Sequence, residues 1–143
     1  FSGADNALAL QEGDKSIPLF VHIPAEENSQ VINHVAGQID LGPTILDLVG
    51  IPTTNKYMLG ENIFVNKDGQ VTYRDGSFVT NDLLYDATPD GIYDNGKCYD
   101  RESRQVTDTS LCKSSHELGI KELRMSDNIL DGNLILEILN LEK

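Results

Sequence analysis

The strongest constraint on the fold comes from residues 17–51, where the spacing of apolar residues changes partway along the stretch. Residues 17–23 form a short apolar run without strict alternation, which favours a strand covered on both faces. Later in the stretch the apolar positions follow helical spacing. Asp40 is expected to cap this helix, Pro43 to lie in its first turn and Gly50 to end it in a left-handed conformation. A strand, a polar loop and a helix in succession predict one unit of an α/β layer fold.

The middle of the chain carries hairpin signals. Asp-Gly pairs at residues 68–69 and 75–76 lie next to short segments rich in Val, Tyr and Phe, a pattern typical of hairpin turns. Residues 91–93 and 97–99 are expected to form another strand pair. We therefore predict a small antiparallel sheet over residues 66–107, with one face open to solvent.

Helical spacing returns near the end of the sequence. Ser114 followed by Glu117 is typical of a capping box at a helix start, and the Asp-Gly pair at residues 131–132 is expected to stop the helix. The run over residues 133–141 is apolar on nearly all sides, so we expect it to be buried against another part of the protein.

The charge balance narrows the classes of partner. With 23 acidic and 11 basic residues the formal net charge is −12, which argues against nucleic-acid binding and against direct attachment to an anionic bilayer. No apolar run approaches the roughly 20 residues of a membrane span, so none is predicted in this chain. The sequence begins without Met and without a secretory signal, and we expect it to be a piece of a longer protein.

Five features are candidates for chemistry. His22 lies in the apolar run, where a buried structural role is expected, and His116 is expected on the surface of a helix. His34 ends the loop after the predicted strand, on the side where α/β proteins bind ligands, and either holds that loop or contacts a ligand. Thr44 is interpreted as a helix-start hydroxyl bonded to the backbone. The acidic residues of 82–94 lack the closing Glu of an EF-hand, so calcium is not predicted.

The chain has two cysteines, Cys98 and Cys112, on either side of a polar segment. No partner Cys or His stands at zinc-type spacing, which argues against a metal site. Two separate buried thiols and one local disulfide both remain compatible with this spacing.

An ordered series of short motifs resembles a known family. The chain has PLF at 18–20, HIP at 22–24, GQID at 37–40, PTILDLVGI at 43–51, YRDGSF at 73–78 and KELRMSDNILDGNL at 121–134. This series is similar to a segment of the sulfatase-like branch of the alkaline phosphatase superfamily. Within that branch it resembles the lipoteichoic acid synthases, which are membrane-anchored phosphoglycerol transferases of Gram-positive bacteria. The resemblance covers residues 17–136, most of the chain.

The resemblance implies that residues 1–143 are the C-terminal part of one extracellular sulfatase-like domain. Residues 1–65 would supply the strand–loop–helix portion of its main α/β layer, and residues 66–143 a small antiparallel subdomain with C-terminal helices. Such enzymes use a divalent metal, here expected to be manganese, a nucleophilic threonine far upstream and an Asp-His pair just before the strand. This sequence contains no Asp-His dipeptide. We therefore expect no catalytic residue, metal ligand or cofactor in this chain.

The expected role is structural, within a parent enzyme that transfers phosphoglycerol from a lipid-linked substrate. The rest of the parent domain would be its partner, on the outer face of the cell membrane or secreted from a Gram-positive bacterium. That setting favours a Cys98–Cys112 disulfide. In the parent enzyme we expect His34 to lie near the substrate, because its loop begins at the carboxyl end of the predicted strand. Two alternatives are a fragment of another sulfatase-like hydrolase of phosphate or sulfate esters, and a free-standing secreted binding module.

Overall fold

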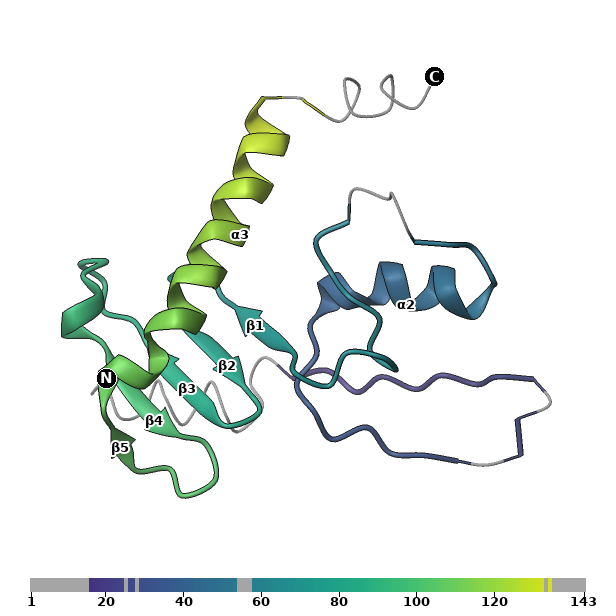
Figure 1. Ribbon diagram of the computed structural model, residues 1–143, viewed down its shortest axis with the longest axis horizontal. Coiled ribbons are helices and arrows are strands. Elements are labelled where there is room, and N and C mark those ends of the chain that lie inside the picture. Colours follow the sequence, from purple (N-terminus) through teal and green to yellow (C-terminus); the bar gives the residue numbers. More distant parts are fainter. Residues whose placement is uncertain (1–15, 25, 28, 54–57, 133, 135–143) are drawn as a thin grey trace.

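The computed structural model describes residues 16–24, 26–27, 29–53, 58–132 and 134 (Figure 1). Within this part lie two α-helices, α2 (Leu41–Leu48) and α3 (Lys113–Asp131), and a five-stranded sheet. Short 3-10 helices η1 (Gln38–Asp40), η2 (Tyr93–Asn95) and η3 (Thr109–Cys112) precede or connect them. The combination of helices and sheet confirms the predicted α/β class. The further helical segment expected over residues 133–141 lies, except for residue 134, outside the described residues.

The sheet is antiparallel, with its strands in chain order: β1 (Gln70–Thr72), β2 (Phe78–Thr80), β3 (Leu83–Asp86), β4 (Lys97–Asp100) and β5 (Val106–Thr107). In the first hairpin Val71 lies opposite Val79, and the Tyr73 N–H donates to the Ser77 carbonyl at 2.8 Å. Gly76 has a φ of 88°, which favours glycine. The hairpin predicted at this Asp-Gly pair and the small antiparallel sheet are confirmed.

The connection between β3 and β4 differs from the prediction. Residues 91–93 do not form a strand but lead into η2, and β4 pairs instead with β3, which the sequence pattern did not indicate. The Tyr85 hydroxyl donates to the Tyr93 carbonyl at 2.8 Å and ties this connection to the sheet. Gly96 lies so close to the Tyr85 ring that a side chain there would collide with it. This close packing, not strand pairing, sets the path of the connection.

The main core lies where α3 crosses the sheet (Figure 1). Phe78, Tyr85, Cys98 and Cys112 form one fully buried cluster, with Leu83, Ala87 and Tyr93 packed against it. Gly119 allows the close approach of α3, because a side chain there would collide with Thr72 of β1.

The opposite face of the sheet was predicted to be open to solvent, and this is wrong at its centre. Leu84 on that face is only 2% exposed, with Tyr73 and Tyr99 packed against it. Large aromatic side chains can cover an aliphatic neighbour on a small sheet without a second layer of secondary structure.

The start of α3 also differs from the predicted capping box. The helical conformation begins earlier, in η3, where the Asp108 carboxylate accepts the Ser110 N–H at 2.9 Å, so Ser114 already lies within α3. The predicted end is confirmed, because α3 ends at Asp131. An exposed ion pair of 2.6 Å between Arg74 and Asp127 connects the first hairpin to the last turns of the helix.

Residues 17–23 are not paired into a strand in the described structure, contrary to the prediction. They run as an extended segment away from the sheet (Figure 1). The side chain of Phe20 is 90% exposed. A strand needs neighbouring strands for its backbone hydrogen bonds. This apolar segment has the extended backbone of a strand, but no other strand of the described residues is paired with it.

Candidate functional site

The C-terminal end of α2 is fixed by its glycine. Gly50 has a φ of 74°, its N–H donates to the Asp47 carbonyl at 2.9 Å, and the Ile51 N–H donates to the Leu46 carbonyl at 2.8 Å. This pair of bonds is the Schellman arrangement, and it confirms the predicted left-handed end. The chain can therefore turn back sharply beside the last turn of α2.

Asp40 does not cap α2 as predicted. Its carboxylate instead accepts the Gly37 N–H at 2.7 Å and the Glu61 N–H at 2.9 Å. The helix start is already covered by η1, so the carboxylate is left to join the loop before the helix to the segment after it. The pKa of Glu122 on α3 is raised by burial and by the nearby charges of Asp40 and Glu61.

Thr44 holds the chain that returns beside α2, residues 61–64 (the returning chain), against the helix. Its hydroxyl donates to the Asp40 carbonyl at 2.6 Å and accepts the Ile63 N–H at 2.9 Å. Thr44 is 2% exposed and Ile63 is 6% exposed. The interpretation of Thr44 as a hydroxyl bonded to backbone is confirmed, and its second bond extends that role to a tertiary contact.

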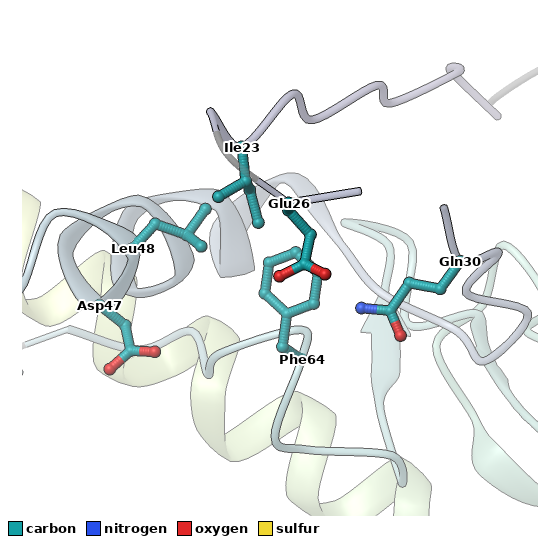
Figure 2. Close-up of a pocket in the computed structure, with 6 residues that line it drawn as sticks. All are labelled: Ile23, Glu26, Gln30, Asp47, Leu48 and Phe64. Atoms are coloured by element: carbon teal, nitrogen blue, oxygen red, sulfur yellow. The ribbon is translucent and has the colours of Figure 1, made fainter. Parts of the chain in front are cut away.

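A hollow of about 380 Å³ opens beside this junction (Figure 2). Its lining comes from the end of the extended segment and the loop after it, from the last turn of α2 and from the returning chain. It consists of Ile23, Glu26, Gln30, Asp47, Leu48 and Phe64. Figure 2 shows Phe64 in the middle of this lining, with Asp47 and Gln30 to either side. Two carboxylates, one amide and an apolar wall therefore meet at one place.

Asn62 orients two of these lining residues. Its side-chain amide donates to the Asp47 carboxylate at 2.7 Å, and its side-chain oxygen accepts the Phe64 N–H at 2.8 Å. A single side chain thereby sets the position of one carboxylate and of the aromatic residue. No sequence pattern marks these residues as a group, because Asp47 lies in α2 whereas Asn62 and Phe64 lie on the chain that returns beside it.

The predicted site residue His34 is half-buried and does not line the hollow. Its Nε2 lies 2.8 Å from the Ile63 carbonyl, so the ring donates a hydrogen bond there. Ile63 directly precedes Phe64, and His34 therefore supports the backbone that carries a lining residue. The structural alternative kept open for His34 fits this contact.

The negatively charged lining of the hollow would repel an anion. Glu26 and Asp47 both present carboxylates, and none of the described lining residues is Lys, Arg or His. A phosphate group would meet like charge without a compensating cation. The hollow suits a ligand that donates hydrogen bonds or carries positive charge.

The other two histidines lie differently from the predictions. His22 is exposed in the described structure, not buried, because the extended segment that carries it has no strand neighbours. His116 is half-buried, with its ring centroid 5.1 Å from that of Tyr85 and 4.7 Å from that of Tyr93. Burial lowers the pKa of His116, although the charge of Glu117 acts in the opposite direction.

Cys98 and Cys112 form a disulfide, with their Cα atoms 6.0 Å apart. Both are fully buried, and the bridge joins β4 to η3 just before α3 begins. The Tyr93 hydroxyl donates to the Thr109 carbonyl in the same region. The segment before α3 is thus fastened to the sheet by the disulfide and to η2 by a hydrogen bond.

In the part of the chain that the structure describes, no group of three or more His, Cys, Asp or Glu side chains is arranged to hold a metal ion. None of the described helices has the length and apolar character needed to cross a membrane.

Comparison with known proteins gives lipoteichoic acid synthases among the sequence relatives of this chain. The lipoteichoic acid synthases of Staphylococcus aureus strains USA300 and MRSA252 are each 32% identical over 143 aligned positions, which cover 91% of this chain. The chain spans about a fifth (21%) of the length of these relatives. No protein-family model matches the chain.

A solved structure supports the same relationship. The crystal structure of the lipoteichoic acid synthase LtaP from Listeria monocytogenes matches with a TM-score of 0.67 and 29% sequence identity. The match covers 76% of this chain and 27% of that one. The sequence resemblance and the predicted α/β fragment are therefore both confirmed.

Proposed function

Because the chain resembles lipoteichoic acid synthases over most of its length, we propose that it forms part of the catalytic domain of a phosphoglycerol transferase. In this proposal it is the C-terminal part of that domain, which lies on the outer face of a Gram-positive cell membrane or is secreted. The substrate would be a lipid-linked phosphoglycerol, and the reaction would extend a polymer.

The observation that carries the proposal is the exposure of an apolar extended segment. Its exposed hydrophobic side chains outside the hollow are Ile17, Leu19, Phe20 and Val21. A run of this kind suits a strand that is covered on both faces inside an α/β domain. Strands supplied by the rest of a larger domain would satisfy both its backbone and its side chains. The curated relatives, at about five times the length of this chain, are long enough to contain such a domain.

The role proposed for this chain is structural. The nucleophile and the metal ligands would come from the rest of the domain, where a divalent ion such as manganese would stabilise charge on the phosphate oxygens. The residues of this chain would complete the sheet, hold α2 through the Thr44–Ile63 bond, and support the rim of the active site through the loop that contains His34.

Activity of the full-length protein tests the reaction. We expect vesicles containing fluorescent phosphatidylglycerol to yield fluorescent diacylglycerol and a glycerophosphate polymer in the presence of Mn²⁺. Free glycerophosphate without polymer would instead indicate a hydrolase. Release of sulfate from aryl sulfates, with no lipid product, would indicate another sulfatase-like enzyme.

Phe20→Ser tests the structural role. In the 143-residue chain Phe20 is 90% exposed, so the substitution should leave the free energy of unfolding unchanged. In the full-length protein it should lower that free energy by about 1.5–3 kcal/mol, the value of burying such a side chain. Glu27→Gln, an exposed change in the following loop, is the matched control. Equal, small effects of Phe20→Ser in both proteins would contradict the proposed docking.

A further inference from the structure

The hollow at the end of α2 combines negative charge with an aromatic and aliphatic wall. Glu26 and Asp47 supply carboxylates, Phe64 supplies an aromatic ring, and Ile23 and Leu48 supply aliphatic surface (Figure 2). We propose that this hollow binds an organic ammonium group. The carboxylates would neutralise its charge, and the apolar wall would contact its alkyl carbons.

The aromatic ring distinguishes this ligand class from a neutral polyol. The face of a Phe ring is electron-rich and attracts an ammonium group held over it, and such rings recur in sites for quaternary ammonium ligands. A polyol could also donate hydrogen bonds to Glu26 and Asp47, but it would gain nothing from the negative charge of the hollow. Charge therefore decides in favour of the cation.

An inorganic cation fits the hollow poorly. Calcium and magnesium take six or more oxygen ligands, whereas half of this lining is aliphatic or aromatic. No group of three or more His, Cys, Asp or Glu in the described residues is arranged to hold a metal. The alkyl groups of an organic ammonium ion can pack against the apolar wall, whereas a hydrated metal ion gains nothing from that contact.

The hollow is partly organised before a ligand arrives. Asn62 donates to Asp47 at 2.7 Å and accepts the Phe64 N–H at 2.8 Å, so one carboxylate and the ring-bearing backbone are held relative to each other. His34 adds a bond of 2.8 Å to the Ile63 carbonyl next to Phe64. Preorganisation of this kind reduces the entropy lost on binding. The net charge of −12 further favours approach of a cation.

This site is separate from the proposed transfer reaction. The transferred phosphoglycerol is anionic, and the lining of the hollow opposes an anion. The proposed catalytic groups lie outside this chain. Loss of amine binding would therefore leave the proposed transfer reaction in place, and failure of that reaction would leave amine binding unaffected.

A titration with choline and with 3,3-dimethylbutan-1-ol, its uncharged isostere, tests the proposal. NMR follows the backbone amide shifts of the 143-residue chain, and the amides of Leu48 and Phe64 should shift on binding. We expect choline to bind at least about tenfold more tightly than the alcohol. Equal affinities would overturn the proposal, because the hollow would then select only apolar shape. Displacement of choline by micromolar Ca²⁺ would also overturn it in favour of a metal site.

Variants locate the site. Glu26→Gln and Phe64→Leu should each weaken choline binding at least about threefold, while Glu102→Gln, an exposed carboxylate in the β4–β5 turn, should leave it unchanged. Thermal unfolding of each variant shows whether the fold is retained. An equal effect of Glu102→Gln would overturn the site assignment, since the net charge alone would then explain binding. Vesicles of phosphatidylcholine form a second arm: variant-sensitive binding to them identifies a lipid headgroup, and binding of free choline alone identifies a soluble amine.

Discussion

The backbone N–H of Ile63 donates a 2.9 Å hydrogen bond to the buried hydroxyl of Thr44, across 19 positions of sequence. The same hydroxyl donates to the Asp40 carbonyl at 2.6 Å. Thr44 therefore acts as donor and acceptor at once, and it holds the returning chain on α2. The hollow beside Phe64 depends on this contact, because Phe64 follows Ile63 directly.

Thr44→Val should lower the free energy of unfolding by about 1–3 kcal/mol, because the isosteric side chain leaves the buried Ile63 N–H without its acceptor. Urea unfolding followed by circular dichroism measures the loss. Thr44→Ser keeps the hydroxyl and removes one methyl group, so its cost should be smaller, about 1 kcal/mol. A serine variant as unstable as the valine variant would show that packing, not the hydrogen bond, matters here.

The sequence predicted the parts of the fold that depend on local chemistry. The left-handed end at Gly50, the hairpin at Gly76 and the stop of α3 at Asp131 were confirmed, because each follows from backbone preferences of a few adjacent residues. The ordered motifs also predicted the relationship to lipoteichoic acid synthases.

What the sequence could not predict depends on contacts between distant segments. β3 was missed because its pairing with β4 is fixed by the packing of Tyr85 over Gly96. His116 was expected on the surface, but its burial comes from two tyrosines about 20 to 30 positions earlier in the chain. The hollow brings Glu26 together with Asp47 and Phe64, both of which are bonded to Asn62, and no local pattern marks such a group.

Removing the Cys98–Cys112 bridge should destabilise the chain. The disulfide closes a loop of 14 positions, and the loop-entropy account gives about 3 kcal/mol for a ring of this size. A reductant should therefore lower the urea midpoint of the unmodified protein but leave a Cys98→Ala/Cys112→Ala variant unchanged. Mass spectrometry after alkylation without reductant gives a separate check, and two labelled thiols would refute the bridge.

Stability should fall as the pH is lowered through the range in which His116 titrates. Burial lowers the pKa of His116 below its usual 6.5, with Glu117 opposing the shift. The unfolded chain therefore takes up this proton at a higher pH than the folded protein does. The neutral ring's contribution is full above about pH 6.5, the unfolded value, and is lost progressively as the pH falls toward the folded value.

His116→Phe isolates this effect, since phenylalanine keeps an aromatic ring beside Tyr85 and Tyr93 without the proton. Urea midpoints of both proteins between pH 7 and 5 should show a steeper decline for the unmodified chain. Burial raises the pKa of Asp86 and of Glu122, which acts in the opposite direction but equally in both proteins. Parallel pH profiles would rule out a contribution from His116.

His34→Ala is the last test, and it separates support of the fold from assistance to the substrate. The ring of His34 donates to the Ile63 carbonyl at 2.8 Å, so its removal should cost about 0.5–1.5 kcal/mol of stability in the 143-residue chain. His22→Ala, which we first expected to be destabilising, should now change this stability by less than about 0.5 kcal/mol, because His22 is exposed. His22→Ala is thus the matched control: it removes an exposed histidine for which the described structure shows no supporting contact.

In the full-length protein we predict that His34 lies near the substrate and donates a hydrogen bond to one of its phosphate or glycerol oxygens. A donor at the rim of an active site is worth less than a fully placed one, so His34→Ala should lower kcat/KM about tenfold, or about 1.4 kcal/mol. His34→Gln can still donate to the Ile63 carbonyl, so it should restore stability but only part of the activity. If His34→Gln restores both fully, or if His34→Ala leaves kcat/KM within about twofold, the ring acts only by holding the backbone before Phe64.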